Sequence, residues 1–353
     1  MPNPAVLLLA HGTPETVEQI PEYLRNVVSG RPVPPHVVEE IQHRYSLIGR
    51  SPLTELTFEQ ARLVEEELNG GASTASHPGD KNKDVARMGH PPVRVPVPVY
   101  VGMRNWRPYI PDVVKQMRAD GVTEAAVICM APQNSRTSVG LYRRAVQAEA
   151  GALRIDFTES WARHPLLAQA FAERLRPAWT KLSRETDHPV PVLFTAHSVP
   201  TRTVEAPPQP SPGQTKEPRL WPGEGPNPSG PDPYADEARH TGELVAARVP
   251  DIPSWTFAFQ SQGASGGPWI GPSVEETLDR LAGEGVTALI LQPIGFLCDH
   301  VEILYDVDIH FRDCAAKLGI RLARPESLNG SVLLARAIAD LARQGLGRLE
   351  ANG

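Results

Sequence analysis

The chain has 353 residues, enough for two domains of ordinary size, and a hydrophobic content of 41%, typical of globular proteins. Its net charge of −6 argues against the strongly basic surface of a general nucleic-acid-binding protein, so we expect no nucleic-acid partner. Three scattered cysteines are too few for a disulfide framework and favour a cytoplasmic location. The apolar run at 5–10 is too short for a signal peptide, and no run approaches the about 18 apolar residues of a transmembrane segment.

Short apolar or β-branched segments alternate with longer amphipathic segments along the chain. Strands are predicted at 6–10, 95–101, 125–130, 190–196, 254–259 and 288–292. Helices are predicted between them at 53–68, 108–120, 165–182 and 273–283. Strands that are apolar throughout and separated by helices are typical of parallel sheets covered on both faces. The sequence therefore predicts an α/β fold.

Two segments have the composition of insertions into this fold. Residues 70–92 are rich in small and polar residues. The second segment, 201–231, is dense in proline, and 11 of the 37 prolines of the chain lie within 200–233. Neither segment has many apolar residues to bury, so we predict both as exposed loops with weak order.

Two short motifs recur in the same order in both halves of the chain. LAHGTP at 9–14 ends the first predicted strand, and TAHSVP at 195–200 ends a later one. DGVT at 120–123 and EGVT at 284–287 each lead into a strand. The paired motifs predict two similarly folded α/β halves, the second of which begins within 155–190.

Residues that follow the strands are candidates for a site, because ligands of open parallel sheets bind beyond the carboxyl ends of the strands. His11 and His197 each follow a strand, although a histidine in this position is often only a structural hydrogen-bonding group. The other candidates at strand ends are Arg104, Asn105, Trp106, Gln133, Asn134, Ser135, Arg136, Thr137, Ser138, Gln260, Ser261, Gln262, Trp269, Asp299, His300 and Glu302.

The segment 299–318 predicts an amphipathic helix with Asp299 as its N-cap. Glu302, Asp306 and His310 are four residues apart and share one face of such a helix. That face is either a solvated acidic surface or a line of cation ligands, and imidazole with carboxylate suits Fe²⁺ better than Mg²⁺. The apolar stripe beside it comprises Ile303, Val307, Phe311, Cys314 and Leu318.

The sequence resembles a ferrochelatase over nearly its whole length. The resemblance rests on AHGTPE (10–15), HRYSLIGRSPL (43–53), YVGMRNWRPYI (100–110), MAPQNSRTSVGLYRRA (130–145), TAHSVP (195–200), DPYADE (232–237), FQSQGASGGPWIGPS (259–273) and PIGFLCDHVEILYDVDI (293–309). In detail these stretches are most similar to the coproporphyrin-using branch of the family. The resemblance implies insertion of Fe²⁺ into coproporphyrin III to give coproheme in heme biosynthesis, with protoporphyrin IX, giving protoheme, as the alternative substrate.

The resemblance also implies a fold of two similar Rossmann-like parallel-sheet domains of the class II chelatase type, with the active-site cleft between them. The N-terminal domain would comprise 1–160 and 325–353, the latter including a C-terminal helix that returns to it. The C-terminal domain would comprise 161–324.

The residue roles that follow are implied by the resemblance. His197 is the proton acceptor and an iron ligand, and Glu302 is its partner as metal ligand and proton relay. Asp306 and His310 form an outer metal site, although the family often has an acidic residue in place of His310. His11 approaches the opposite face of the ring, where the coproporphyrin branch often has Tyr. The remaining porphyrin-binding candidates are Arg31, Arg44, Ser51, Arg104, Ser135, Thr137, Ser261 and Trp269, with Trp106 as a second wall. For Trp106 and Trp269, ordinary packing in the core is the alternative.

No permanently bound cofactor is expected, and Fe²⁺ is a substrate. Some family members carry a [2Fe–2S] cluster on cysteines near the C-terminus, but no cysteine follows Cys314, so we expect no cluster. We expect a monomer that receives porphyrin and ferrous iron, with a downstream enzyme of heme synthesis as a candidate partner. A cobalt chelatase acting on sirohydrochlorin and a non-catalytic tetrapyrrole carrier are the alternatives outside this reaction.

Overall fold

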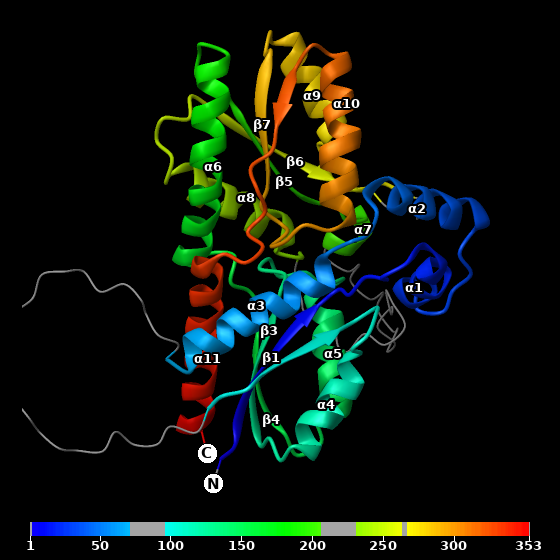
Figure 1. The fold of residues 1–353 in the computed structure, drawn as a ribbon, viewed down its shortest axis with the longest axis vertical. Coiled ribbons are helices and arrows are strands. Elements are labelled where there is room, and N and C mark those ends of the chain that lie inside the picture. Colours follow the sequence, from blue (N-terminus) through cyan, green and yellow to red (C-terminus); the bar gives the residue numbers. More distant parts are fainter. Residues whose placement is uncertain (1, 71–95, 206–230, 263–266, 353) are drawn as a thin grey trace, which may run out of the picture.

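Two parallel sheets form the frame of the protein, one in the lower half and one in the upper half of Figure 1. The structure, a computed structural model, describes residues 2–70, 96–205, 231–262 and 267–352. The first sheet has the order β2-β1-β3-β4, with β1 at Pro4–Ala10, β2 at Val99–Met103, β3 at Glu124–Cys129 and β4 at Arg154–Thr158. The second has the order β6-β5-β7-β8, with β5 at Val192–His197, β6 at Trp255–Gln260, β7 at Ala288–Pro293 and β8 at Arg321–Ala323.

The two sheets have the same topology. In each half the first strand lies between the second and the third, and the fourth strand lies outside the third. Every strand pairing in the described chain is parallel; Leu7 of β1, for example, is aligned with Tyr100 of β2 and Val127 of β3. The predicted α/β fold with two similar parallel-sheet halves is therefore confirmed.

Helices cover both faces of each sheet, as the apolar strands require. These helices are α3 (Leu53–Leu68), α4 (Ile110–Ala119), α5 (Val139–Glu149), α6 (Pro165–Glu185), α8 (Tyr234–Ala246), α9 (Val274–Gly283), α10 (Arg312–Lys317) and α11 (Val332–Ala351). One large buried cluster joins α3, α6, α8 and α11 to one face of both sheets. The opposite face is covered by α4 and α5 in the first sheet and by α9 and α10 in the second.

The C-terminal helix α11, red in Figure 1, packs beside the first sheet although it comes last in the chain. It contacts α3, β3 and β4, and it also contacts α6. The division into 1–160 with 325–353 and 161–324 stays a prediction.

A small lobe stands beside the first sheet. It consists of a short 3₁₀ turn at Val17–Gln19 and the helices α1 (Ile20–Val27) and α2 (Pro35–Ile48). Its own buried cluster includes Tyr23, Tyr45 and Trp106, so Trp106 is a core residue of this lobe. Contacts between α2 and the helix that begins at Glu302 connect the lobe to the second half.

The helix that begins near residue 301 differs from the prediction in two ways. Residues Glu302–Phe311 form a π-helix, which has wider turns than an α-helix and is rare outside functional sites. The buried stripe comprises Ile303, Val307, Phe311 and Ala315, which are all four residues apart. The predicted stripe is wrong at Leu318, which is 38% exposed. The N-cap prediction is also wrong, because Asp299 accepts hydrogen bonds from Ser327 and Asn329 instead of capping the helix.

The second predicted insertion begins with ordered structure. Thr201–Val204 form the short helix α7, in which Thr203 is buried. The prediction of an exposed loop that starts at residue 201 is therefore wrong for these four residues. The rest of that prediction and nearly all of the predicted loop at 70–92 lie outside the described residues.

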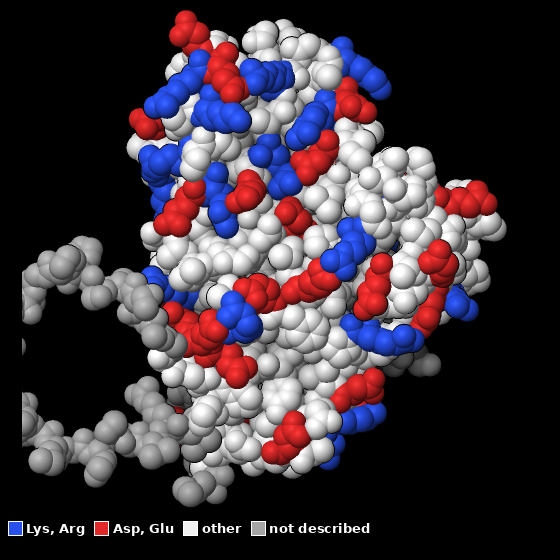
Figure 2. Space-filling model, in the orientation of Figure 1, with Lys and Arg blue, Asp and Glu red and all other residues white. Residues whose placement is uncertain are grey.

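The surface carries mixed charge. On the face drawn in Figure 2, basic and acidic side chains of the described residues are interspersed rather than gathered by sign. Within the described ranges, no helix has the length and apolar character needed to cross a membrane.

Candidate active site

A cleft of about 350 Å³ lies where the carboxyl ends of the strands of both sheets meet. Its lining includes His11, which follows β1, and Arg104, which follows β2. From the second half it includes His197 at the end of β5 and Glu302 at the start of the π-helix. Residues that follow strands in both halves therefore line one cleft, as expected for ligand sites beyond the carboxyl ends of parallel strands. The volume of the cleft is within the usual range of ligand sites.

The AHGTP motif leaves β1 through a turn that only glycine accommodates easily. Gly12 has a φ of +78°, and a Cβ atom there would lie 2.9 Å from the Cβ of Met103. This close passage sets the path of the chain directly after His11.

His197 and Glu302 meet in the cleft. The Nε2 atom of His197 lies 3.3 Å from one carboxylate oxygen of Glu302, and the Nε2 atom of His300 lies 3.6 Å from the other. The Nδ1 atoms of the two imidazoles contact the backbone carbonyls of Ser198 and Cys298. Because a carbonyl only accepts, each Nδ1 carries its hydrogen, and each Nε2 faces the carboxylate of Glu302.

This pair holds a proton in the free protein. Burial opposes the charged form of His197, but the Glu302 carboxylate, with smaller contributions from the Ser198 carbonyl and Asp306, outweighs burial and raises the pKa of His197 to about 9. Burial likewise opposes the charge on Glu302, yet His197 and His300 hold its pKa well below the usual range. At neutral pH the site therefore contains an imidazolium paired with a carboxylate, and both groups can bind a cation once that proton leaves.

The DPYADE stretch supports His197 from behind. The hydroxyl of Tyr234 donates a hydrogen bond of 2.9 Å to the backbone carbonyl of His197. Asp232 accepts from the backbone N–H groups of Tyr234 and Arg136, at 3.0 and 2.8 Å. The role of Tyr234 as a support was missed at the sequence level, although the DPY motif marks its position. Phe296, also missed, packs its ring between those of His197 and His300.

His11 enters the cleft from the first half in a neutral state. Its Nε2 atom lies 2.9 Å from the hydroxyl of Tyr23 and 3.0 Å from the side-chain nitrogen of Asn105. Burial, with the nearby Arg104 charge, lowers the pKa of His11 to about 3. Of the two histidines in the repeated motif, His11 is therefore neutral at pH 7 and His197 is protonated.

The two residues predicted for an outer metal site have other partners. Asp306 is buried, pairs with Arg44 at 3.0 Å and accepts a hydrogen bond from Ser261. Burial raises the pKa of Asp306 above its usual range, although Ser261 and Arg44 favour its charged form. His310 is exposed and pairs with Glu275 at 3.2 Å. In the described parts of the chain, no three Asp, Glu, His or Cys side chains form a set that could hold one metal ion.

The remaining candidates fall into two groups. Arg104, Ser135, Thr137 and Trp269 line the cleft, whereas Arg31, Arg44, Ser51 and Ser261 are absent from its described lining. The Nη1 atom of Arg104 donates to the backbone carbonyl of Thr137 at 3.3 Å, while its Nε atom is buried and has no hydrogen-bond partner. The hydroxyls of Ser135 and Thr137 are 2.9 Å apart. Arg104 therefore brings a guanidinium group to a polar end of the cleft, which suits a carboxylate.

Comparisons with known proteins agree on one family. The family model described as Ferrochelatase matches residues 3–346. A protein named ferrochelatase from Acidobacterium capsulatum is 57% identical, over 99% of this chain and 96% of its own. One named coproporphyrin III ferrochelatase from Mycolicibacterium vanbaalenii is 32% identical, over 96% of this chain and 88% of its own.

A solved structure matches the fold. The sirohydrochlorin chelatase SirB from Bacillus subtilis subspecies spizizenii, in complex with cobalt, superimposes with a TM-score of 0.51 and 11% identity. The match covers 99% of this chain and 97% of the other. At this identity the likeness shows the class II chelatase fold alone.

Proposed function

This chain belongs to the ferrochelatase family, a family of metal chelatases, and we propose that it inserts Fe²⁺ into coproporphyrin III to give coproheme. The observation that carries the proposal is the His197–Glu302 pair in a cleft with strand-end groups from both halves. Relatives named for coproporphyrin III at 28–32% identity support the choice of porphyrin. We also propose that the protein is a cytoplasmic monomer without an iron–sulfur cluster.

Insertion requires that two pyrrole N–H protons leave while the ring nitrogens receive the metal. In the proposed mechanism, neutral His197 accepts a pyrrole proton at Nε2, and Glu302 stabilises the resulting imidazolium from 3.3 Å. Glu302 also contacts His300, which gives the proton a second imidazole on the way out of the site. Before Nε2 takes up that proton, its lone pair would bind incoming Fe²⁺ together with the carboxylate oxygens, since imidazole and carboxylate are both ligands of this ion. Nε2 becomes free to accept a pyrrole proton when the iron passes to the ring nitrogens, and release of that proton through Glu302 and His300 frees it for the second. We propose that Asp306 and His310 act farther along this route.

The choice between porphyrins depends on carboxylate recognition. Coproporphyrin III carries four propionates and protoporphyrin IX carries two. The guanidinium of Arg104 and the hydroxyls of Ser135 and Thr137 could bind a propionate inside the cleft. A hydrogen bond to a charged group contributes about 1.5–3 kcal/mol, so one extra contact of this kind changes affinity by at least about tenfold.

We therefore predict that kcat/KM with anaerobic Fe²⁺ is at least about tenfold higher for coproporphyrin III than for protoporphyrin IX. Arg104→Leu should reduce that ratio, because it removes a donor from the cleft. Arg280→Leu is the control and should leave the ratio unchanged, because Arg280 of α9 lies outside the described lining of the cleft and has only an exposed pair with Glu284 and a contact of 3.4 Å with Thr256. A wild-type ratio below one would replace coproporphyrin with protoporphyrin in this proposal.

The activity should rise with pH. Only neutral His197 can accept a proton or bind metal, and below its pKa of about 9 the neutral fraction increases as the pH increases. The value of kcat/KM for Fe²⁺ should therefore increase by up to about tenfold per pH unit between pH 6 and 8, and level off towards pH 9. The measurement is an anaerobic pH series at saturating porphyrin. A profile that is flat from pH 6 to 8 would show that the imidazolium in the pair does not limit the reaction.

A further inference from the structure

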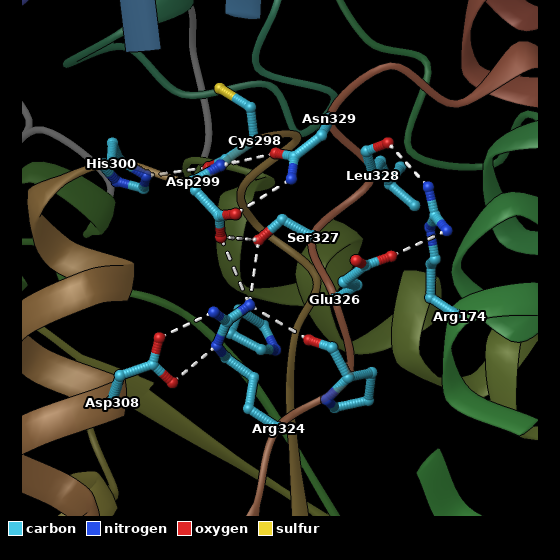
Figure 3. A network of polar contacts seen from close by, with 12 residues as sticks. Arg174, Cys298, Asp299, His300, Asp308, Arg324, Glu326, Ser327, Leu328 and Asn329 are labelled. Atoms are coloured by element: carbon cyan, nitrogen blue, oxygen red, sulfur yellow. Dashed lines mark hydrogen bonds and ion pairs between the residues drawn. The ribbon is translucent and has the colours of Figure 1, made fainter. Parts of the chain in front are cut away.

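A buried charged network lies behind the cleft and is not used in the mechanism above. Figure 3 shows Arg324, which follows β8, between Asp299 and Asp308. Its Nε and Nη2 atoms bind the two carboxylate oxygens of Asp308 at 2.9 and 2.7 Å. Its Nη1 atom lies 3.3 Å from Asp299 and also donates to Ser327 and to the carbonyl of Pro325. The guanidinium therefore has partners on all three nitrogens, and the side chain is only 11% exposed.

The two carboxylates that Arg324 joins belong to different parts of the catalytic segment. Asp308 is on the π-helix that Glu302 begins, and Asp299 immediately precedes His300. One guanidinium thus ties the loop before Glu302 to the π-helix after it. These contacts on both sides of Glu302 help to define where the first residue of the π-helix lies.

The backbone at Asp299 is fixed as well. Its N–H donates to the side-chain oxygen of Asn329 at 2.9 Å, and Asn329 donates back to its carboxylate at 2.9 Å. Ser327 donates to the same carboxylate at 2.6 Å. Asn329 is in turn held by Gln60 of α3, at 2.9 Å. The network therefore connects the catalytic segment to the chain between β8 and α11 and to a helix of the first half.

We propose that Arg324 is a positioning residue for metal insertion: by joining Asp299 to Asp308 it holds Glu302 and His300 where they meet His197. This inference rests on the proposed role of Glu302 in metal insertion and is independent of which porphyrin is used. Arg324 is absent from the described lining of the cleft. A lysine cannot replace it, because an ammonium group lacks the planar fork that binds both oxygens of Asp308 while reaching Asp299. Arg312, which lies 3.5 Å from Asp308, is exposed and would not replace the lost contact.

The test compares Arg324→Lys with Arg174→Lys in the full chain. Arg174 also binds the chain after β8, through Glu326 and the carbonyl of Leu328, but the structure shows it bound to neither carboxylate of the network (Figure 3). We expect Arg324→Lys to lower kcat/KM for Fe²⁺ by about 10–100-fold, the usual effect of losing a residue that orients a metal ligand. Porphyrin affinity, measured by quenching of porphyrin fluorescence, should change less than about twofold, and Arg174→Lys should behave as wild type.

Two results would overturn the proposal. One is an Arg324→Lys protein with wild-type kcat/KM for Fe²⁺ and a lowered Tm, which would make the network a structural brace only. The other is an equal loss in both variants. If Arg324→Lys does not fold, Asp299→Asn, which keeps the shape of the side chain, takes its place. Its kcat/KM for Fe²⁺ and its porphyrin affinity are measured in the same way, and an unchanged kcat/KM again refutes the proposal. A wild-type protein that metallates no porphyrin would instead refute the proposed function.

Discussion

Replacing His197 by alanine should reduce Fe²⁺ insertion by at least about 10³-fold with either porphyrin. The variant loses the proton acceptor and the Nε2 atom proposed to bind iron. Glu302 remains, but His197 is the main group that holds its pKa low, so without His197 only His300 opposes the effect of burial, which favours the neutral carboxyl, a poorer proton acceptor and metal ligand. The loss should therefore exceed that of a proton acceptor alone.

Anaerobic formation of the metalloporphyrin, followed by absorbance, gives the rate of insertion in this variant. Porphyrin affinity should be retained, because the cleft has many other lining residues. His240→Ala provides the matched control, since His240 is a partly exposed histidine of α8 paired with Glu243 at 3.1 Å and lies outside the cleft lining. A His197→Ala protein that keeps full insertion activity would remove this residue from the mechanism.

Replacing Glu302 by glutamine should reduce insertion by about 10²-fold and should also change His197 itself. The carboxylate is the main group that raises the pKa of His197, ahead of the Ser198 carbonyl and Asp306, whereas burial acts in the opposite direction. In Glu302→Gln the pKa of His197 should consequently fall from about 9 to its ordinary value of about 6.5 or below. The imidazole would then be neutral at pH 7, yet it would lack the partner that stabilises its protonated form.

NMR titration of the histidine ring signals in the metal-free protein measures this change, with His197→Ala to assign the signal. Glu284→Gln, which removes the charge of an exposed glutamate after α9, should alter neither the titration nor the rate. A His197 pKa that stays near 9 in Glu302→Gln would mean that another group, such as Asp306, sets the charge state of the site.

The sequence predicted the four central strands, which are buried on both faces, and also the edge strands β2 and β6, which are buried over their second halves. The runs in β1, β3, β5 and β7 are almost wholly apolar, because helices cover both sides of these central strands. The edge strand β4 reads RIDFT and is only half-buried, so its alternating pattern gave a weaker signal. The other missed strand, β8, has three residues, too few for any periodicity to be visible.

The sequence predicted those residues of the site that directly follow strands, because ligands of parallel sheets bind beyond the carboxyl ends of the strands. His197 and Glu302 were expected in one cleft because both follow strands of a parallel sheet, and the structure brings them within 3.3 Å. The pairing of Arg44 with Asp306 links the α2 lobe to the second half, and no local pattern indicates a contact between residues so far apart in the chain. The π-helix was missed for another reason: a spacing of four residues also occurs in α-helices, so Glu302, Asp306 and His310 were placed on a common face.

The most direct test of the function is a competition among substrates. Wild-type protein is mixed anaerobically with equal concentrations of coproporphyrin III, protoporphyrin IX and sirohydrochlorin, and limiting Fe²⁺ or Co²⁺ is then added. Chromatography identifies the metallated products. We predict that coproheme is the main product with Fe²⁺. A majority of protoheme would contradict the choice of porphyrin, preferential cobalt insertion into sirohydrochlorin would contradict iron-porphyrin chemistry, and tight binding without any metallated product would contradict the catalytic role.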